Sequence, residues 1–127
     1  MEEENKTQKK ILIVEDDEDL RELYLEILRD SGFSVLEAVD GAAGLEKALA
    51  GGYDLLLLDI MLPKVDGLEI LRQLKQRPAF QTLPVILLTN LGRDTFIKDG
   101  FALGAAAYLI KSALTPNQVV DEVRKFI

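Results

Sequence analysis

The sequence contains no cysteine and no histidine. Without cysteine, the chain has no disulfide bonds, no thiolate metal ligands and no cysteine nucleophile. Without histidine, it has no imidazole ligands and lacks the commonest general base. Any chemistry that the chain performs must therefore use carboxylates, hydroxyls and lysine.

Long hydrophobic runs and an excess of positive charge are also missing. The apolar runs at residues 55–58 and 84–88 are far shorter than the roughly 20 residues that cross a bilayer, so no membrane partner is expected. The N-terminal sequence MEEENKTQKK lacks the apolar core of a secretory signal. We therefore expect residues 1–9 to be a polar tail and the protein to be cytoplasmic. A formal net charge of -7 argues against direct binding of nucleic acid.

The residues that are present suit one globular domain, expected at residues 10–127, because the chain has 127 residues of which 48% are hydrophobic. Short apolar runs alternate with amphipathic or capped segments. The expected strands are residues 10–15, 34–38, 54–59, 84–89 and 105–110, and the expected helices are residues 20–28, 41–50, 67–77, 93–103 and 116–127. This alternation predicts parallel strands joined by right-handed crossovers, in an α/β doubly wound five-stranded sheet.

The predicted helices differ in how clearly their buried faces are marked. In the first, Leu23 belongs to the apolar repeat, and Arg21 falls among the polar positions between the repeats. In the fourth, Gly100 lowers the helical propensity, so this helix is expected to be the mobile one. Three apolar residues of that helix suit either the core or a partner-binding face: Phe96, Ile97 and Phe101.

Polar residues end four of the predicted strands. In a doubly wound sheet, ligands bind beyond the carboxyl ends of the strands, so we expect these side chains to converge. Converging carboxylates need a cation or a proton to offset their repulsion, and oxygen ligands alone favour a hard ion such as Mg²⁺. The residues concerned are Glu15, Asp16 and Asp17 at the end of the first strand, Asp59 at the end of the third, Thr89 at the end of the fourth and Lys111 at the end of the fifth.

This combination predicts phosphoryl transfer. An ionised Asp59 is a competent nucleophile toward phosphorus when Lys111 and a metal ion absorb charge on the transferred group, and Thr89 can donate a hydrogen bond to it. Taken alone, Asp59 is better explained as a turn former, and its position beside Glu15, Asp16, Thr89 and Lys111 is what favours a nucleophile. The acids at residues 17–19 are explained by helix capping and the helix dipole.

Four segments, in order and at the right spacing, resemble the receiver domains of response regulators in two-component signalling. They are ILIVEDDEDLRELY, LLLLDIMLPKVDG, LLTN and AYLIKS, and the similarity covers nearly the whole chain. The resemblance implies a flavodoxin-like three-layer sandwich with strand order 2-1-3-4-5. We expect a stand-alone receiver of the single-domain type.

The resemblance also implies roles for individual residues. Asp59 corresponds to the phosphoacceptor, Thr89 to the switch hydroxyl, Tyr108 to the switch aromatic and Lys111 to the lysine that binds the phosphoryl group. The expected protein is a phosphoacceptor switch rather than an enzyme, because it catalyses only its own phosphorylation and slow dephosphorylation.

The metal site follows from the same resemblance. Asp16 and Asp59 are expected to bind Mg²⁺, or alternatively Mn²⁺, through their side chains, and Met61 through its backbone carbonyl. Glu15 is expected to act through a water molecule.

The implied phosphoryl donor is a histidine kinase or a histidine phosphotransfer protein. An unknown downstream protein is expected to bind the surface made by the fourth helix (residues 93–103), the fifth strand (residues 105–110) and the fifth helix (residues 116–127). A phosphorylation-dependent dimer is a further expectation.

Two departures from the family pattern affect these expectations. Ser112 stands where a proline, often with a cis peptide bond, usually follows the lysine. Because a cis bond before a non-proline residue costs about 2.5–4 kcal/mol, we expect a trans bond or a locally altered loop. Met61 and Leu91 are apolar where a polar side chain can position a hydrolytic water, which predicts a long-lived phosphoaspartate.

Three alternatives compete with a working switch. A phosphatase of the haloacid-dehalogenase type needs a second acid two residues after the nucleophile, where this chain has Met61. A flavin or nucleotide binder needs a glycine-rich turn after the first strand, where this chain has acids that repel phosphate. A degenerate receiver that serves only as an interaction module stays open.

Overall fold

The computed structural model describes residues 8–90 and 94–127, with the side chains of the second range described from residue 97 onward. Of the expected polar tail at residues 1–9, all but the last two residues lie outside the described part. Leu91 and the side chain of Phe96 lie outside it as well. In the parts that are described, no helix is both long and apolar enough to cross a membrane.

The five expected strands form one parallel sheet in the order β2-β1-β3-β4-β5, so the predicted fold is confirmed. The strands are β1 (Lys10–Val14), β2 (Ser34–Ala38), β3 (Leu55–Leu58), β4 (Val85–Thr89) and β5 (Ala107–Ile110). The helices between and after them are α2 (Glu18–Asp30), α3 (Gly41–Ala50), α4 (Gly67–Lys75), α5 (Asp94–Ala102) and α6 (Pro116–Arg124). Short 3₁₀ turns follow α4 and β5, at η1 (Pro78–Phe80) and η2 (Lys111–Ala113).

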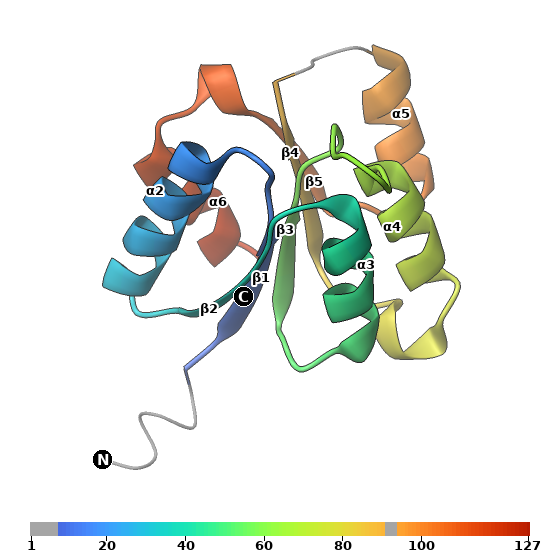
Figure 1. Cartoon of the computed structure of the whole chain (residues 1–127), viewed down its shortest axis with the longest axis horizontal. Coiled ribbons are helices and arrows are strands. Elements are labelled where there is room, and N and C mark those ends of the chain that lie inside the picture. The colour runs from blue at the N-terminus through green and yellow to red at the C-terminus, as the bar shows by residue number, and fades with distance from the viewer. Residues whose placement is uncertain (1–7, 91–93) are drawn as a thin grey trace.

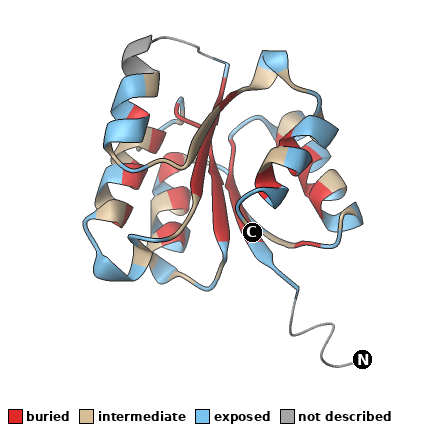
Figure 2. Cartoon of the chain, turned by 180° about the vertical axis from the view of Figure 1, so that it is seen from behind, coloured by how far each residue is buried: buried red, intermediate tan, exposed pale blue. Residues whose placement is uncertain are grey.

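The sheet is the middle layer of a three-layer sandwich. Helices α2 and α6 cover one face, and α3, α4 and α5 cover the other (Figure 1). Figure 2 shows the central strands buried between the two helical layers. The four consecutive leucines of β3 are all buried, because alternate side chains enter the two separate cores. The sheet therefore has a dry centre, and polar side chains gather at its ends.

Side chains that follow the strands also start the helices. Asp17, Asp40 and Asp66 accept hydrogen bonds from backbone N–H groups three residues later and so cap α2, α3 and α4. The capping role expected for Asp17 is therefore confirmed. At α6, Thr115 and Gln118 form a reciprocal capping box.

The predicted buried face of α2 was wrong at two positions. Leu23 is 41% exposed, whereas Arg21 is only 8% exposed. The buried residues Arg21, Tyr24, Leu25 and Leu28 follow an i, i+3, i+4, i+7 spacing, which makes one stripe along the helix. Arg21 can lie on this stripe because its guanidinium finds hydrogen-bond acceptors at the end of the sheet.

Gly100 has a packing role that its helical propensity did not reveal. A Cβ atom at this position would lie 2.5 Å from Cδ1 of Leu87, so glycine lets α5 approach β4 closely. Phe101, the next residue, is 50% exposed, which favours a partner-binding face over the core for this side chain.

Gly67 fixes the path of the loop that follows β3. A Cβ atom at Gly67 would lie 2.2 Å from the backbone oxygen of Asp59 and 2.8 Å from Cα of Ile60. We expect Gly67→Ala to lower the free energy of unfolding by about 1–3 kcal/mol, because the backbone must move to relieve the overlap. Urea unfolding followed by circular dichroism would measure this change.

Gly100→Ala is the matched control for this prediction. Its added Cβ meets the end of the Leu87 side chain, which can rotate away, whereas Gly67→Ala meets the backbone. A smaller loss of stability is therefore expected for Gly100→Ala. Equal losses in the two variants would contradict a special constraint at Gly67.

Candidate functional site

The carboxyl ends of the strands meet around a hollow of about 380 Å³ at one end of the sheet. Six of the seven residues predicted for the site line this hollow, and Tyr108 is the one that does not. The lining residues are Glu15, Asp16, Asp17, Leu20, Asp59, Met61, Thr89, Asn90 and Lys111.

Three carboxylates approach one another in the hollow. Glu15, Asp16 and Asp59 each offer an oxygen within 4.8 Å of the others. Backbone N–H groups orient the two buried acids, since Asp17 donates to Glu15 Oε2 (3.1 Å) and Met61 donates to Asp59 Oδ1 (3.2 Å). Asp16, in contrast, is exposed to solvent.

Lys111 is the cationic group among these acids. Its Nζ atom donates to a carboxylate oxygen of Glu15 and to Asp59 Oδ2, the latter at 3.0 Å. The Lys111 side chain is buried, as are the side chains of both partners. One ammonium group against three carboxylates leaves the hollow negative, which favours binding of a cation.

Burial raises the pKa of Glu15 to about 7, and the charge of Asp59 acts in the same direction. The hydrogen bond and the charge of Lys111 oppose this rise. Burial lowers the pKa of Lys111, but its contacts with Glu15 and Asp59 outweigh burial and leave the pKa raised. Lys111 therefore stays charged at neutral pH, whereas Glu15 titrates near neutral pH.

The donor set fits a hard divalent cation. All three side chains offer oxygen atoms, and the exposed Asp16 opens the hollow to solvent. Glu15 and Asp59 each contact Lys111 and a backbone N–H group, whereas Asp16 is exposed, so Asp16 is the acid that an ion from solvent reaches most directly. When bound, Mg²⁺ would supply the positive charge that the hollow lacks.

Thr89 and Tyr108 lie on the neighbouring strands β4 and β5, with Thr89 at the strand end and Tyr108 paired with Leu87. Thr89 is buried at the end of β4, where it faces the hollow. Tyr108 is half-buried in β5, and its ring lies 3.8 Å from the Cβ position at Gly100 of α5. Burial, assisted by the charge of Asp59, raises the pKa of the Tyr108 phenol. Tyr108 thus lies against α5, whereas Thr89 lines the hollow.

The loop after Lys111 differs from the usual proline-containing one. The described residues contain no cis peptide bond, so the bond between Lys111 and Ser112 is trans, as expected. Residues 111–113 form the 3₁₀ turn η2.

Arg21 is the residue of this region that sequence reasoning missed. Its guanidinium donates to the backbone oxygen of Glu15 and to the carboxylate of Glu37, each at 3.0 Å. A charged residue three and four positions before the buried Tyr24 and Leu25 was the available signal, because that spacing places it on the buried stripe.

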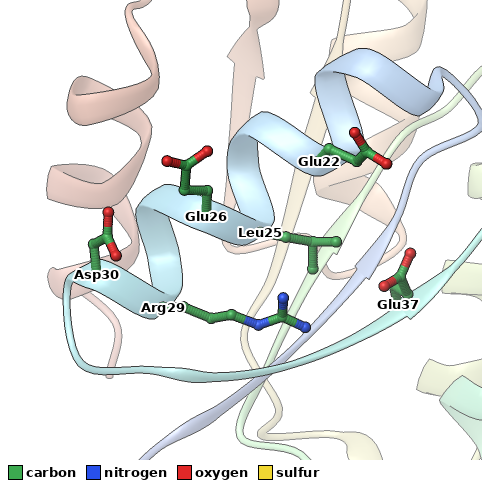
Figure 3. A pocket seen from close by; sticks show the side chains of 6 residues that line it. All are labelled: Glu22, Leu25, Glu26, Arg29, Asp30 and Glu37. Atoms are coloured by element: carbon green, nitrogen blue, oxygen red, sulfur yellow. The ribbon is translucent and has the colours of Figure 1, made fainter.

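A second hollow, of about 420 Å³, lies between α2 and the edge strand β2 (Figure 3). Acidic side chains follow its α2 side at intervals of four residues, and the one basic lining side chain is Arg29. Its lining residues come from the sides of these elements rather than from strand ends: Glu22, Leu25, Glu26, Arg29, Asp30 and Glu37. The hollow at the strand ends is therefore the stronger candidate for phosphoryl chemistry.

A doubly wound sheet with carboxylates, a lysine and a threonine gathered at its strand ends is the arrangement of a phosphoacceptor signalling domain. The family model described as "Response regulator receiver domain" matches residues 11–124. The chain belongs to this family, whose members act in two-component signal transduction. The predicted family and general function are therefore confirmed.

Similar proteins include the transcriptional regulatory protein ResD of Bacillus subtilis, 35% identical over 127 residues, which cover 100% of this chain and 50% of ResD. The solved structure of chemotaxis protein CheY4 of Vibrio cholerae has a TM-score of 0.87 at 25% identity, covering 95% of this chain and 100% of CheY4. Response regulator TrrA of Thermotoga maritima, solved in complex with Mg²⁺-BeF, has a TM-score of 0.83 at 31% identity, covering 94% and 100%. The chain spans about half the length of the curated relatives that it matches.

Proposed function

We propose that Asp59 accepts a phosphoryl group with the help of Mg²⁺, or alternatively Mn²⁺. In this proposal Asp16, Asp59 and the backbone carbonyl of Met61 hold the ion, and Glu15 acts through a water molecule. The observation that carries the proposal is the contact of Lys111 with Asp59 in a hollow where three carboxylates lie within 4.8 Å. Such a cluster suits charge that develops during phosphoryl transfer.

In the proposed reaction, a carboxylate oxygen of Asp59 attacks the phosphorus of a phosphohistidine on a donor protein. The bond from phosphorus to the histidine nitrogen breaks at the same time. The nitrogen keeps the electron pair, and Asp59 becomes an acyl phosphate. Lys111 transfers its hydrogen bond from the Asp59 carboxylate to a phosphoryl oxygen, and the Thr89 hydroxyl donates to another. The Tyr108 side chain then moves in response to the new position of the Thr89 hydroxyl, and α5 shifts together with Tyr108.

The proposed donor is a histidine kinase or a histidine phosphotransfer protein, because these 127 residues contain no histidine that could carry the phosphoryl group. The proposed output surface comprises α5, β5 and α6, where the exposed ring of Phe101 is available to a downstream protein or to a second receiver. A cytoplasmic location would place the protein beside such a donor.

Incubation with acetyl phosphate and Mg²⁺, followed by intact mass measurement, tests the proposal. The protein should gain one phosphoryl group, and EDTA should prevent the gain. Borohydride reduction and peptide mapping should locate the group on Asp59. A protein that folds and binds Mg²⁺ but gains no mass would instead be a degenerate receiver that acts as an interaction module.

Mg²⁺ affinity should depend on pH through Glu15. Below its pKa of about 7, Glu15 carries a proton and offers less negative charge to the ion. The association constant should therefore rise as pH increases from 5.5 to 7, up to about tenfold per pH unit for one displaced proton, and level off above 8. Isothermal titration calorimetry in buffers of different ionisation enthalpy would detect the released proton.

Glu15→Gln is the control for this pH dependence. The glutamine variant should bind Mg²⁺ with an affinity that is nearly flat between pH 6 and 8. A slope that survives in this variant would assign the titration to another group.

The apolar residue at position 61 predicts a slowly hydrolysed phosphoaspartate. The Met61 side chain is 55% exposed beside the hollow, where a polar group could hold a water molecule near phosphorus. We expect Met61→Asn to shorten the phosphoprotein half-life several-fold, and Met61→Leu to leave it nearly unchanged. A phosphoprotein-gel time course measures both, and equal decay in all three proteins would contradict the explanation.

A further inference from the structure

We propose that Arg21 is a positioning residue for the metal site, which holds the backbone between Glu15 and Asp16 in the orientation that brings both acids to the ion. This inference rests on the proposed function of the same site. It assigns a role to a buried charge that the phosphoryl-transfer steps do not use.

The contact that matters is the one from Arg21 to a backbone oxygen. Nη1 of Arg21 donates to the carbonyl of Glu15 at 3.0 Å, in a buried environment. This carbonyl belongs to the planar peptide group that joins Glu15 to Asp16. Fixing this plane, together with the preceding plane that the sheet holds, fixes the direction in which the Glu15 side chain leaves the backbone and the position of the Asp16 Cα atom.

The backbone contacts of the sheet reach the preceding peptide group, which joins Val14 to Glu15 and whose carbonyl accepts from the Asp59 N–H group at 3.1 Å. The Glu15 N–H group still donates to the carbonyl of Ala38 on β2 at 3.2 Å. Its carbonyl accepts instead from Arg21, which lies on α2. The Arg21 side chain thus restrains the backbone at the point where the hydrogen bonds between β1 and its neighbouring strands end.

Glu37 on β2 anchors the other end of the guanidinium. Nε of Arg21 donates to Glu37 Oε1 at 3.0 Å, and the backbone oxygen of Glu37 accepts from Nζ of Lys47. Figure 3 shows the Glu37 side chain on the strand side of the hollow, facing α2. Because a guanidinium is a planar fork, it can reach a carbonyl and a carboxylate at once, which an ammonium group cannot do with the same geometry.

The charge of Arg21 allows a purely electrostatic role to be distinguished from a positioning role, because the two roles predict opposite changes in Mg²⁺ affinity. If Arg21 acted only through its charge, its removal would make the hollow more negative and tighten Mg²⁺ binding. A positioning role predicts the opposite. Loss of an outer contact that orients metal ligands typically weakens binding by about 10- to 100-fold.

The test compares Arg21→Gln, Arg21→Lys and Glu37→Gln with the unmodified chain. Mg²⁺ dissociation constants are measured by calorimetry at a temperature where each protein is fully folded, and thermal unfolding in EDTA records the loss of stability separately. We expect the dissociation constant to rise at least tenfold in Arg21→Gln, with partial recovery in Arg21→Lys and a smaller rise in Glu37→Gln.

Arg29→Gln is the matched control, because Arg29 is an exposed residue of the same helix that lines the hollow of Figure 3. It should leave Mg²⁺ affinity within twofold of the unmodified value. An Arg21→Gln protein that is less stable in EDTA yet binds Mg²⁺ normally, or more tightly, would overturn the inference. Failure of the unmodified chain to bind Mg²⁺ would instead overturn the proposed function.

Discussion

Asp59→Asn is expected to abolish the gain of a phosphoryl group from acetyl phosphate. An amide oxygen is a poor nucleophile toward phosphorus, and the other acids of the hollow are less suited to replace Asp59. The pKa of Glu15 is raised to about 7, so this carboxyl group is partly protonated at neutral pH, and Asp16 lies out in solvent. Intact mass measured under conditions that phosphorylate the unmodified chain would show only the unphosphorylated species.

This variant should keep its fold, so the loss can be attributed to chemistry. Asparagine retains one oxygen, which can accept from either the Met61 N–H group or Lys111, because Asp59 receives these two contacts on different oxygens. It also removes a charge that repels Glu15, as the raised pKa of Glu15 reflects. Thermal unfolding in EDTA should occur at the same temperature or higher. A phosphorylated Asp59→Asn protein would mean that another residue is the acceptor.

Lys111→Met is expected to lower the free energy of unfolding by about 3–5 kcal/mol in the absence of Mg²⁺, because it leaves the buried carboxylates of Glu15 and Asp59 without their cationic partner. Methionine fills a similar volume, so the loss reports the missing charge more than a cavity. Added Mg²⁺ should restore part of the stability. The rate of phosphoryl acceptance should fall as well, because no ammonium group remains to donate a hydrogen bond to the transferred phosphoryl group.

The pH dependence of this variant has a defined sign. A carboxyl group whose pKa is raised by folding stabilises the folded state fully below its usual value of 4.5 and loses this contribution as pH rises through the folded-state pKa. Without the opposing hydrogen bond and charge of Lys111, the pKa of Glu15 should rise above about 7. Denaturant unfolding should therefore show a deficit that is small at pH 5 and large at pH 8. The same deficit at both pH values would contradict the electrostatic explanation.

The sequence predicts most of the fold because its signals are local. Apolar runs mark the strands, and capping residues such as Asp40 and Thr115 mark where helices begin. The candidate site was accessible for a related reason: in a parallel sheet, strand ends meet at one edge, so residues such as Asp59 and Lys111 could be brought together without knowledge of the loops.

Features that depend on contacts between elements were not predictable in the same way. Arg21 is buried because two acceptors from different strands meet it, and Leu23 is exposed because the helix turns Arg21 inward. Gly100 has a packing role only because α5 approaches Leu87 of β4. In each case the deciding partner is distant in sequence, so the local pattern gave the wrong or an incomplete interpretation.

The four leucines of β3 determine where movement can occur. Their side chains are wedged alternately into two cores, so a shift of this strand along its axis would open both cores at once. Asp59 follows directly after this packed strand, and its backbone N–H group donates to the carbonyl of Val14. Under the proposed function, the conformational change that follows phosphorylation would therefore be confined to peripheral segments, while the packed centre of the domain keeps its position.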